Sequence, residues 1–338
     1  MGASAVSHPA LRRIRDARVS ERHFRLLTLL TLISLVALIG SGGWVRLSES
    51  GLGCPTWPKC YANRLAAHDT YHALIEFANR CVITTVGVLV VLTLIAAFRR
   101  RNPRRDLSWL AGGLVIGYVG EAVLGGITVL LKLAPELVAA HLVLAMLLLV
   151  DGVVLHWRAG DSRPEGAPAP EGEPSVGVDV RRLGQLLLAA ITAVIVLGTV
   201  ATGSGPRAGS PDTKRFPFKF SSTVELHAVV GMFLFGLVVA SFFVLRATGA
   251  PQRIRKLHLG LLGLMALQGI VGYVQYFTKL QIDLVEIHII GAALLVIALV
   301  RFNLELGPPR TPDYALAERT PSTIALPTRS AARASTAS

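Results

Sequence analysis

The segment Lys132-Leu-Ala-Pro-Glu-Leu-Val-Ala-Ala-His141 aligns without gaps with Lys279-Leu-Gln-Ile-Asp-Leu-Val-Glu-Ile-His288. Both copies begin with Lys-Leu and end with a histidine, and a long apolar stretch follows each histidine. Histidine inside a bilayer is costly, so it is rarely kept without a task. The segment therefore predicts a duplicated membrane bundle whose histidines lie at one depth.

The composition places the chain among integral membrane proteins. It has 338 residues, of which 52% are hydrophobic and only 16% are charged. A membrane span needs about 20 apolar residues. Eight stretches satisfy this requirement, namely residues 26–45, 75–98, 107–131, 137–157, 183–202, 224–245, 257–277 and 285–302. We expect an all-α integral membrane fold with eight transmembrane helices.

The repeat predicts how these helices are grouped. Residues 26–158 and 183–303 would form two tandem four-helix bundles, and a weaker match between Gly43–Gly51 and Gly198–Gly205 supports the pairing. Because each unit has an even number of helices, a pseudo-two-fold axis along the membrane normal should relate them. Residues 1–25 are a basic N-terminus, residues 159–182 a cytoplasmic linker, and residues 304–338 a tail expected to be disordered.

The net charge of +13 is distributed as topology requires. Arginines cluster before the first span, between the second and third, before the fifth, and between the sixth and seventh, which all lie on one side of the membrane. This is the positive-inside pattern, so we expect a multi-pass protein of the cell membrane with both termini cytoplasmic. The same distribution argues against nucleic-acid binding.

Four polar residues lie just inside the outer ends of the even-numbered spans: Asn79, His141, His227 and His288. Two facing imidazoles from neighbouring helices can hold a haem iron from both sides, which makes His227 and His288 candidate axial ligands. Zinc usually takes a third or fourth His, Cys or carboxylate ligand. The alternative is a pair of capping or interface histidines near the lipid headgroups.

In the first half, His141 corresponds to His288, but the position equivalent to His227 is Asn79. Asparagine is a poor ligand for haem iron, so this site should hold a porphyrin through one strong axial ligand or through a substitute. His72 lies about two helical turns before Asn79 and is the candidate substitute. The competing interpretation makes His72 an exposed residue of the outer loop.

Glu76 is three residues before Asn79 and therefore shares its helix face. A carboxylate that enters the membrane needs a partner or a task, and beside an incompletely ligated porphyrin it could accept a proton. Arg80 could provide a salt bridge or contact a haem propionate. The simpler alternative is a Glu76–Arg80 pair that only anchors the helix end.

Two cysteines, Cys54 and Cys60, flank a short outer loop stiffened by two prolines and a tryptophan. Outside the membrane a disulfide is the default state of such a pair. The loop would serve as a lid over the first-half site, while a redox role is the alternative.

Three motifs, together with the histidines and the repeat, resemble the haem A synthase family over residues 22–301. They are Gly43-Trp-Val-Arg-Leu-Ser-Glu-Ser-Gly-Leu-Gly-Cys54-Pro-Thr-Trp-Pro-Lys-Cys60, Ile75-Glu76-Phe-Ala-Asn79-Arg80 and Thr202-Gly-Ser-Gly-Pro-Arg-Ala-Gly209. Family members often have Glu-x-x-His-Arg where this chain has Glu76-Phe-Ala-Asn79-Arg80. This departure removes or replaces one substrate-side ligand.

The resemblance implies an oxidoreductase that converts the C8 methyl group of haem O to a formyl group, with oxygen expected from water, and supplies haem A to a terminal oxidase. It implies that His227 and His288 ligate a haem b cofactor through iron. It assigns His141, Asn79 and Arg80 to the substrate haem, Glu76 to catalysis, and Cys54–Cys60 to a disulfide. Expected partners are the bilayer, haem O synthase as the source of substrate, an unidentified electron acceptor, and further copies of the chain.

Two other functions compete with this interpretation. A di-haem b-type electron carrier without ring chemistry would have paired histidines in both halves, and Asn79 counts against it. A haem transporter or chaperone would have helices broken by Gly or Pro near midspan, whereas the prolines here lie mostly in loops.

Overall fold

The computed structural model describes residues 18–63, 70–161 and 176–307, and these contain eight long α-helices. Each helix has 24 to 28 residues and is apolar enough to cross a membrane. They are α2 (Glu21–Leu47), α3 (Tyr71–Phe98), α4 (Arg105–Leu130), α5 (Pro135–Ala159), α6 (Val178–Ser204), α7 (Phe220–Ala247), α8 (Gln252–Phe277) and α9 (Ile282–Glu305). The prediction of an all-α, eight-span membrane protein is confirmed.

Most helices extend beyond the predicted spans by several residues. At the start of α2, for example, Glu21 and Arg22 continue the helix, and the side chain of Ser20 accepts a hydrogen bond from the His23 backbone N–H at 3.3 Å. Hydropathy detects only the apolar part of a helix, because polar end turns continue the backbone hydrogen bonds outside the hydrocarbon.

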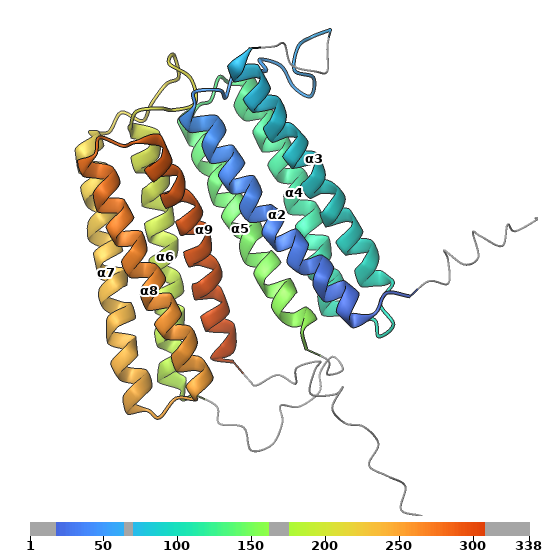
Figure 1. The fold of residues 1–338 in the computed structure, drawn as a ribbon, viewed down its shortest axis with the longest axis vertical. Helices are drawn as coiled ribbons and strands as arrows, with labels where there is room; N and C mark the ends of the chain where they lie inside the picture. Colours follow the sequence, from blue (N-terminus) through green and yellow to red (C-terminus); the bar gives the residue numbers. More distant parts are fainter. Residues whose placement is uncertain (1–17, 64–69, 162–175, 308–338) are drawn as a thin grey trace, which may run out of the picture.

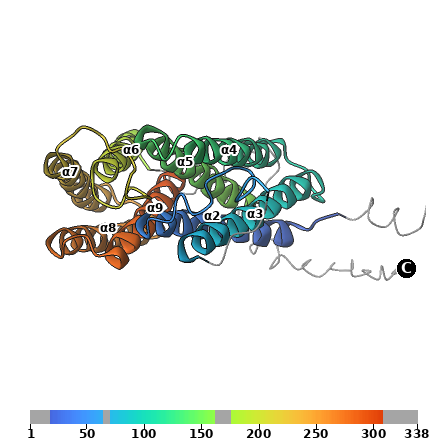
Figure 2. The same ribbon diagram turned by 90° about the horizontal axis from the view of Figure 1, so that it is seen from above.

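Viewed from above, the helices form two rows (Figure 2). One row contains α7, α6, α5 and α4, and the other contains α8, α9, α2 and α3. Helices α2–α5 therefore form one group and α6–α9 the other, with α9 packed against both α2 and α5. α2 begins and α9 ends at the same end of the bundle (Figure 1). The division into two groups therefore follows the order of the helices along the chain.

The turns before α5 and α9 are equivalent in their backbone geometry, which supports the repeat. Lys132, Leu133, Lys279 and Leu280 all have positive φ angles between 52° and 60°. The N–H of Leu133 donates to the carbonyl of Thr128 at 2.8 Å, and the N–H of Leu280 donates to the carbonyl of Gln275 at 2.8 Å. The aligned sequence thus forms the same tight turn twice, and each turn leads directly into a histidine-bearing helix.

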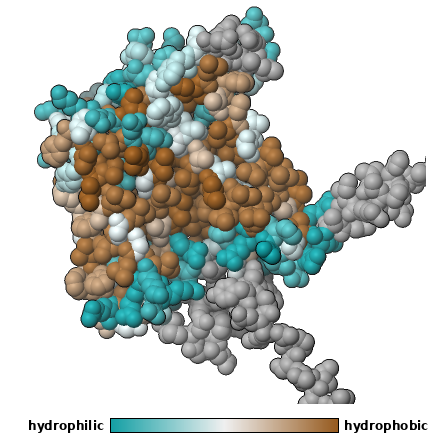
Figure 3. All heavy atoms as spheres, in the orientation of Figure 1, coloured by the Kyte–Doolittle hydropathy of each residue, from teal (hydrophilic) through white to brown (hydrophobic). Residues whose placement is uncertain are grey.

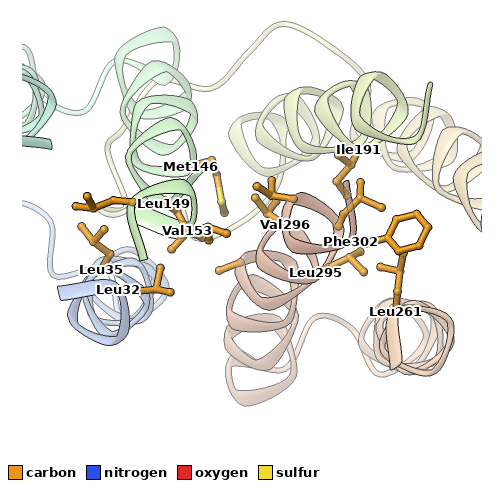
Figure 4. Packing of buried hydrophobic residues seen from close by; sticks show 14 of the residues in the cluster. Leu32, Leu35, Met146, Leu149, Val153, Ile191, Leu261, Leu295, Val296 and Phe302 are labelled. Carbon is orange, nitrogen blue, oxygen red and sulfur yellow. The ribbon is translucent and has the colours of Figure 1, made fainter. Parts of the chain in front are cut away.

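The surface has the polarity of a membrane protein. A hydrophobic belt crosses the middle of the molecule between hydrophilic ends (Figure 3). Large apolar side chains such as Trp109, Ile116 and Phe277 are more than 70% exposed, as lipid contact allows. Inside, Leu32 and Leu35 of α2 lie beside Leu149 of α5 (Figure 4). The core continues between the two groups, where Met146 of α5 lies toward α9 (Figure 4).

Polar contacts join the two groups at both ends of the helices. At one end the Gly51 N–H donates to the Gly209 carbonyl at 2.9 Å, and the guanidinium of Arg46 donates to the Thr202 carbonyl at 2.6 Å. At the other end the indole N–H of Trp157 donates to Glu305 Oε1 at 2.9 Å. Residues 1–17, most of the predicted linker and the tail after residue 307 lie outside the described residues.

Candidate haem-binding site

The second half brings two predicted ligands together. His227 lies near the start of α7 and His288 near the start of α9, and their ring centres are 6.3 Å apart with the planes at 74°. Two imidazoles bonded to one metal ion at about 2.0–2.1 Å each place their ring centres roughly 6 Å apart. The pair therefore has the spacing that a shared iron requires.

The surroundings of the two rings suit ligation through Nε2. His227 Nδ1 lies 3.0 Å from the carbonyl oxygen of Val194, so this nitrogen can donate and leave Nε2 free as a ligand. Glycines make room for both rings. A Cβ added at Gly198 of α6 would lie 3.1 Å from His227 Cε1, and one added at Gly272 of α8 would lie 3.1 Å from His288 Cε1. We call such a glycine, which leaves space for a histidine ring, a socket glycine. The two imidazoles and their socket glycines fit a haem held between α7 and α9.

The first half holds a single histidine of this kind. His141 lies near the start of α5, and its Nδ1 is 2.5 Å from Oε2 of Glu121 on α4. Gly125, also on α4, again provides the socket, because an added Cβ would lie 3.2 Å from His141 Cε1. The second half has an equivalent glycine beside each histidine ring. Among the described residues, it has no carboxylate equivalent to Glu121.

The two candidate partners of His141 are engaged elsewhere. The amide oxygen of Asn79 accepts a hydrogen bond from the Ser41 hydroxyl of α2 at 2.7 Å. His72 is exposed at the start of α3, and its Nδ1 lies 2.9 Å from the hydroxyl of Ser50. The structure thus places His72 in the first turn of α3 with its side chain exposed, and not in the preceding loop.

Glu76 and Arg80 form an i,i+4 ion pair at 2.7 Å that grips the disulfide loop. Glu76 is buried, and its Oε2 accepts a hydrogen bond from the Cys54 backbone N–H at 2.7 Å. Arg80 donates to four loop carbonyls, at 3.1 to 3.2 Å, on Cys54, Thr56, Pro58 and Lys59. The pair therefore holds the loop as well as the helix end.

The disulfide between Cys54 and Cys60 is formed, as predicted. Both cysteines are fully buried against the start of α3. The loop reaches across to α4, where a Cβ added at Gly126 would lie 2.6 Å from the ring of Trp57. Because Gly126 is adjacent to Gly125, the loop covers the outer end of the helix that supports His141.

Residues 25–300 match the sequence profile of a family described as cytochrome oxidase assembly protein. The chain belongs to this family. The match covers all eight helices apart from their outermost turns, so it includes every candidate residue of both halves.

Within the cytochrome oxidase assembly family, the chain is similar to several curated heme A synthases. It is 25% identical over 311 residues to the protein of Shewanella oneidensis, a match that covers 78% of this chain and 90% of the relative. It is 37% identical over 100 residues to the protein of Symbiobacterium thermophilum, covering 29% of this chain and 32% of the relative. With the protein of Shouchella clausii it shares 30% identity over 131 residues, covering 38% and 44%.

Glu121, Gln268 and the three socket glycines were not predicted from the sequence. The repeat carries a signal for them, because Glu121, Gly125 and His141 have the same spacing as Gln268, Gly272 and His288. Extending the alignment backwards from the histidines would have found the two polar residues at one position. Among the described residues, no three His, Cys, Asp or Glu side chains gather as a metal centre.

Proposed function

We propose that this chain is a haem A synthase, which oxidises the C8 methyl group of haem O to a formyl group and so provides haem A for a terminal oxidase. The family and the curated relatives support this function. The main observation in its support is that the two halves of the bundle have different histidine sites. One half has a pair of imidazoles at iron-sharing distance, and the other has one imidazole beside a carboxylate.

In the second half, His227 and His288 would hold a haem b cofactor through its iron. A bis-histidine haem supplies one-electron transfer when it is bound. The bond from His227 Nδ1 to Val194 orients that ring, and the glycine sockets on α6 and α8 allow both rings to approach the space between the helices. The protein contributes rigidity here and no proton chemistry.

In the first half, His141 holds the substrate haem from one side. The position opposite in the repeat is Asn79, which does not bind iron strongly, so that face is left for chemistry and product can leave. Arg80 belongs to the same site in this proposal, because it fixes Glu76 and the disulfide loop. The disulfide loop then limits access of bulk water to this end.

Glu76 is the catalytic carboxylate in this proposal. Oxidation of a methyl group to a formyl group with one water releases protons and electrons in equal number. Glu76 is buried and is held at both oxygens, so it can accept a proton at a fixed place. The electrons leave through an acceptor outside this chain.

The proposed location is the cell membrane, with both termini cytoplasmic and the histidine-bearing helix ends toward the outer side. The basic clusters of the sequence support this orientation. Haem O reaches the site from the bilayer, supplied by haem O synthase, either directly within a complex or by diffusion. Assembly into homo-oligomers belongs to the same proposal.

The test uses a host that makes haem O but no haem A. The host expresses the wild-type chain, Glu76→Gln, or Glu136→Gln as the control, because Glu136 is an exposed carboxylate at the start of α5. Extracted haems are separated and identified by mass. We expect haem A or its hydroxylated precursor with wild type and Glu136→Gln, and a loss of about 100-fold or more with Glu76→Gln.

The same experiment separates the synthase from the electron carrier. A folded wild-type protein with a bis-histidine spectrum that leaves haem O unconverted would contradict the proposal. It would favour a b-type carrier without ring chemistry.

A further inference from the structure

Glu121 is a buried carboxylate whose surroundings provide one polar contact. Its side chain is 10% exposed, and Oε2 lies 2.5 Å from His141 Nδ1. The other oxygen, Oε1, is buried without a hydrogen-bond partner in the described part of the chain. A carboxylate in such a place is costly unless it is paired. The imidazole of His141 is therefore its partner.

The 2.5 Å between these two atoms is an ion-pair distance without the alignment of a hydrogen bond. At that distance two lone pairs would repel each other, so a proton belongs to one of the two atoms. If the proton belongs to Nδ1, the His141 ring presents the lone pair of Nε2 to the bundle. A carboxylate behind a ligand histidine fixes the tautomer and the ring orientation, and makes the ligand more basic. Gly125, one helical turn from Glu121 on α4, admits the ring on the same face.

The second half shows what the repeat does without this carboxylate. Gln268 takes the position of Glu121, and its amide N–H donates to the backbone carbonyl of His288 at 2.8 Å. No hydrogen bond joins Gln268 to the His288 ring among the described residues, and the Nδ1 of His288, like that of His141, has no aligned hydrogen-bond partner there. His141 differs in having a carboxylate oxygen 2.5 Å from its Nδ1. His227 uses a neutral backbone carbonyl instead. Of these three histidines, His141 alone has an acidic partner among the described residues.

We propose that Glu121 is a positioning residue that makes His141 a strong single axial ligand for the substrate porphyrin. The inference rests on the proposed function, in which the first half binds haem O. Where two imidazoles share one iron, neither has to hold it alone, and a neutral partner suffices. With Asn79 opposite, His141 has no second imidazole to help it, and the carboxylate strengthens the one bond that remains.

The experiment compares full-length wild type, Glu121→Gln and Glu121→Asp, each carrying its haem b, in lipid nanodiscs. Asp151→Asn is the matched control, since Asp151 of α5 is a half-buried carboxylate with one buried oxygen, lying against Gly113 of α4. The probe is added haem O. The measurements are its dissociation constant and the iron–histidine stretching band of the reduced protein by resonance Raman spectroscopy. A bis-histidine haem does not give this band, so the signal reports the first half.

We expect Glu121→Gln to shift the band to lower frequency and to weaken haem O binding by about 10- to 100-fold. Glu121→Asp should recover part of both, and Asp151→Asn should match wild type. A band and an affinity that do not change in Glu121→Gln, in protein with an intact haem b spectrum, would overturn the role of Glu121 alone. Wild-type protein that binds haem O without this band would overturn both the inference and the first-half site.

Discussion

His141 and His288 occupy the same position in the repeat and lie on equivalent helices, yet the residue at one neighbouring position differs. Glu121 approaches the ring of His141, while Gln268 bonds the backbone of His288. A second difference lies on the opposite helix, where Asn79 replaces the equivalent of His227. In the proposed function, these two differences separate a bis-histidine haem site from one that keeps an open face.

Asn79→His tests this contrast, because it restores the residue expected from the repeat. A second imidazole should convert the first-half porphyrin to a bis-histidine species and slow its release. We expect purified protein to retain more haem O or haem A, and to show a second low-spin signal by electron paramagnetic resonance. Ser41→Ala is the control, because it removes the hydroxyl that contacts Asn79 without adding a ligand. A spectrum identical to wild type would contradict the assignment of Asn79 to this site.

At the scale of elements, three pairs of helices share the same packing contact, in which a glycine on one helix faces a histidine on the next. The pairs are Gly125 with His141, Gly198 with His227, and Gly272 with His288. Small residues let membrane helices approach closely, and here they also decide where a ring can lie.

Gly272→Ala should therefore displace His288 by a few tenths of an ångström. Overpacking of this kind costs on the order of 1 kcal/mol, so haem b affinity should fall by several-fold. Gly269→Ala on the same helix has open space around the added methyl group and should leave haem b binding at the wild-type level. Haem occupancy after dialysis measures both variants. Equal occupancy in the two would show that the socket does not position the ring.

The disulfide loop depends on the start of α3. Arg80→Lys replaces a guanidinium that donates to four loop carbonyls with an ammonium group that cannot span them. Each hydrogen bond from a charged group contributes about 1.5–3 kcal/mol, so the loop should open locally. Hydrogen–deuterium exchange of the peptide around Cys54 should become faster, while exchange in α7 stays unchanged. A loop as protected as in wild type would show that the disulfide and Glu76 suffice.

The positions of the helices could be predicted well from the sequence, and the contacts between side chains could not. Apolar length located all eight helices, because the bilayer imposes it, and the spacing of Lys132 to His141 located the repeat. The Cys54–Cys60 disulfide also followed from the sequence. The contact of Glu121 with His141 and the grip of Arg80 on the loop could not be predicted in this way. They depend on how α4 is rotated against α5 and on the path of the loop, and neither leaves a periodic signal.

At the scale of the molecule, the two groups of helices place both histidine sites at the same end of the bundle, because α3, α5, α7 and α9 all begin there (Figure 1). The proposed orientation puts this end outside the cytoplasm. Substrate from the bilayer would then reach the first-half site near the outer surface, beneath the disulfide loop.

Labelling of single cysteines tests the orientation. In a Cys81→Ser background, Asp212→Cys lies between α6 and α7 and Thr248→Cys lies between α7 and α8, at opposite ends of one helix. Both positions are exposed. A membrane-impermeant maleimide should label the Asp212→Cys variant in intact cells and the Thr248→Cys variant only after lysis. The reverse pattern would contradict the proposed topology.

The central claim, that the two halves hold unlike haems, is tested most directly by haem spectra and haem A production in three full-length variants, His141→Ala, His227→Ala and His288→Ala. We predict that His227→Ala and His288→Ala lose the low-spin haem b spectrum. His141→Ala should keep that spectrum and make no haem A. A low-spin spectrum that survives in both second-half variants, or that disappears in His141→Ala, would contradict the account.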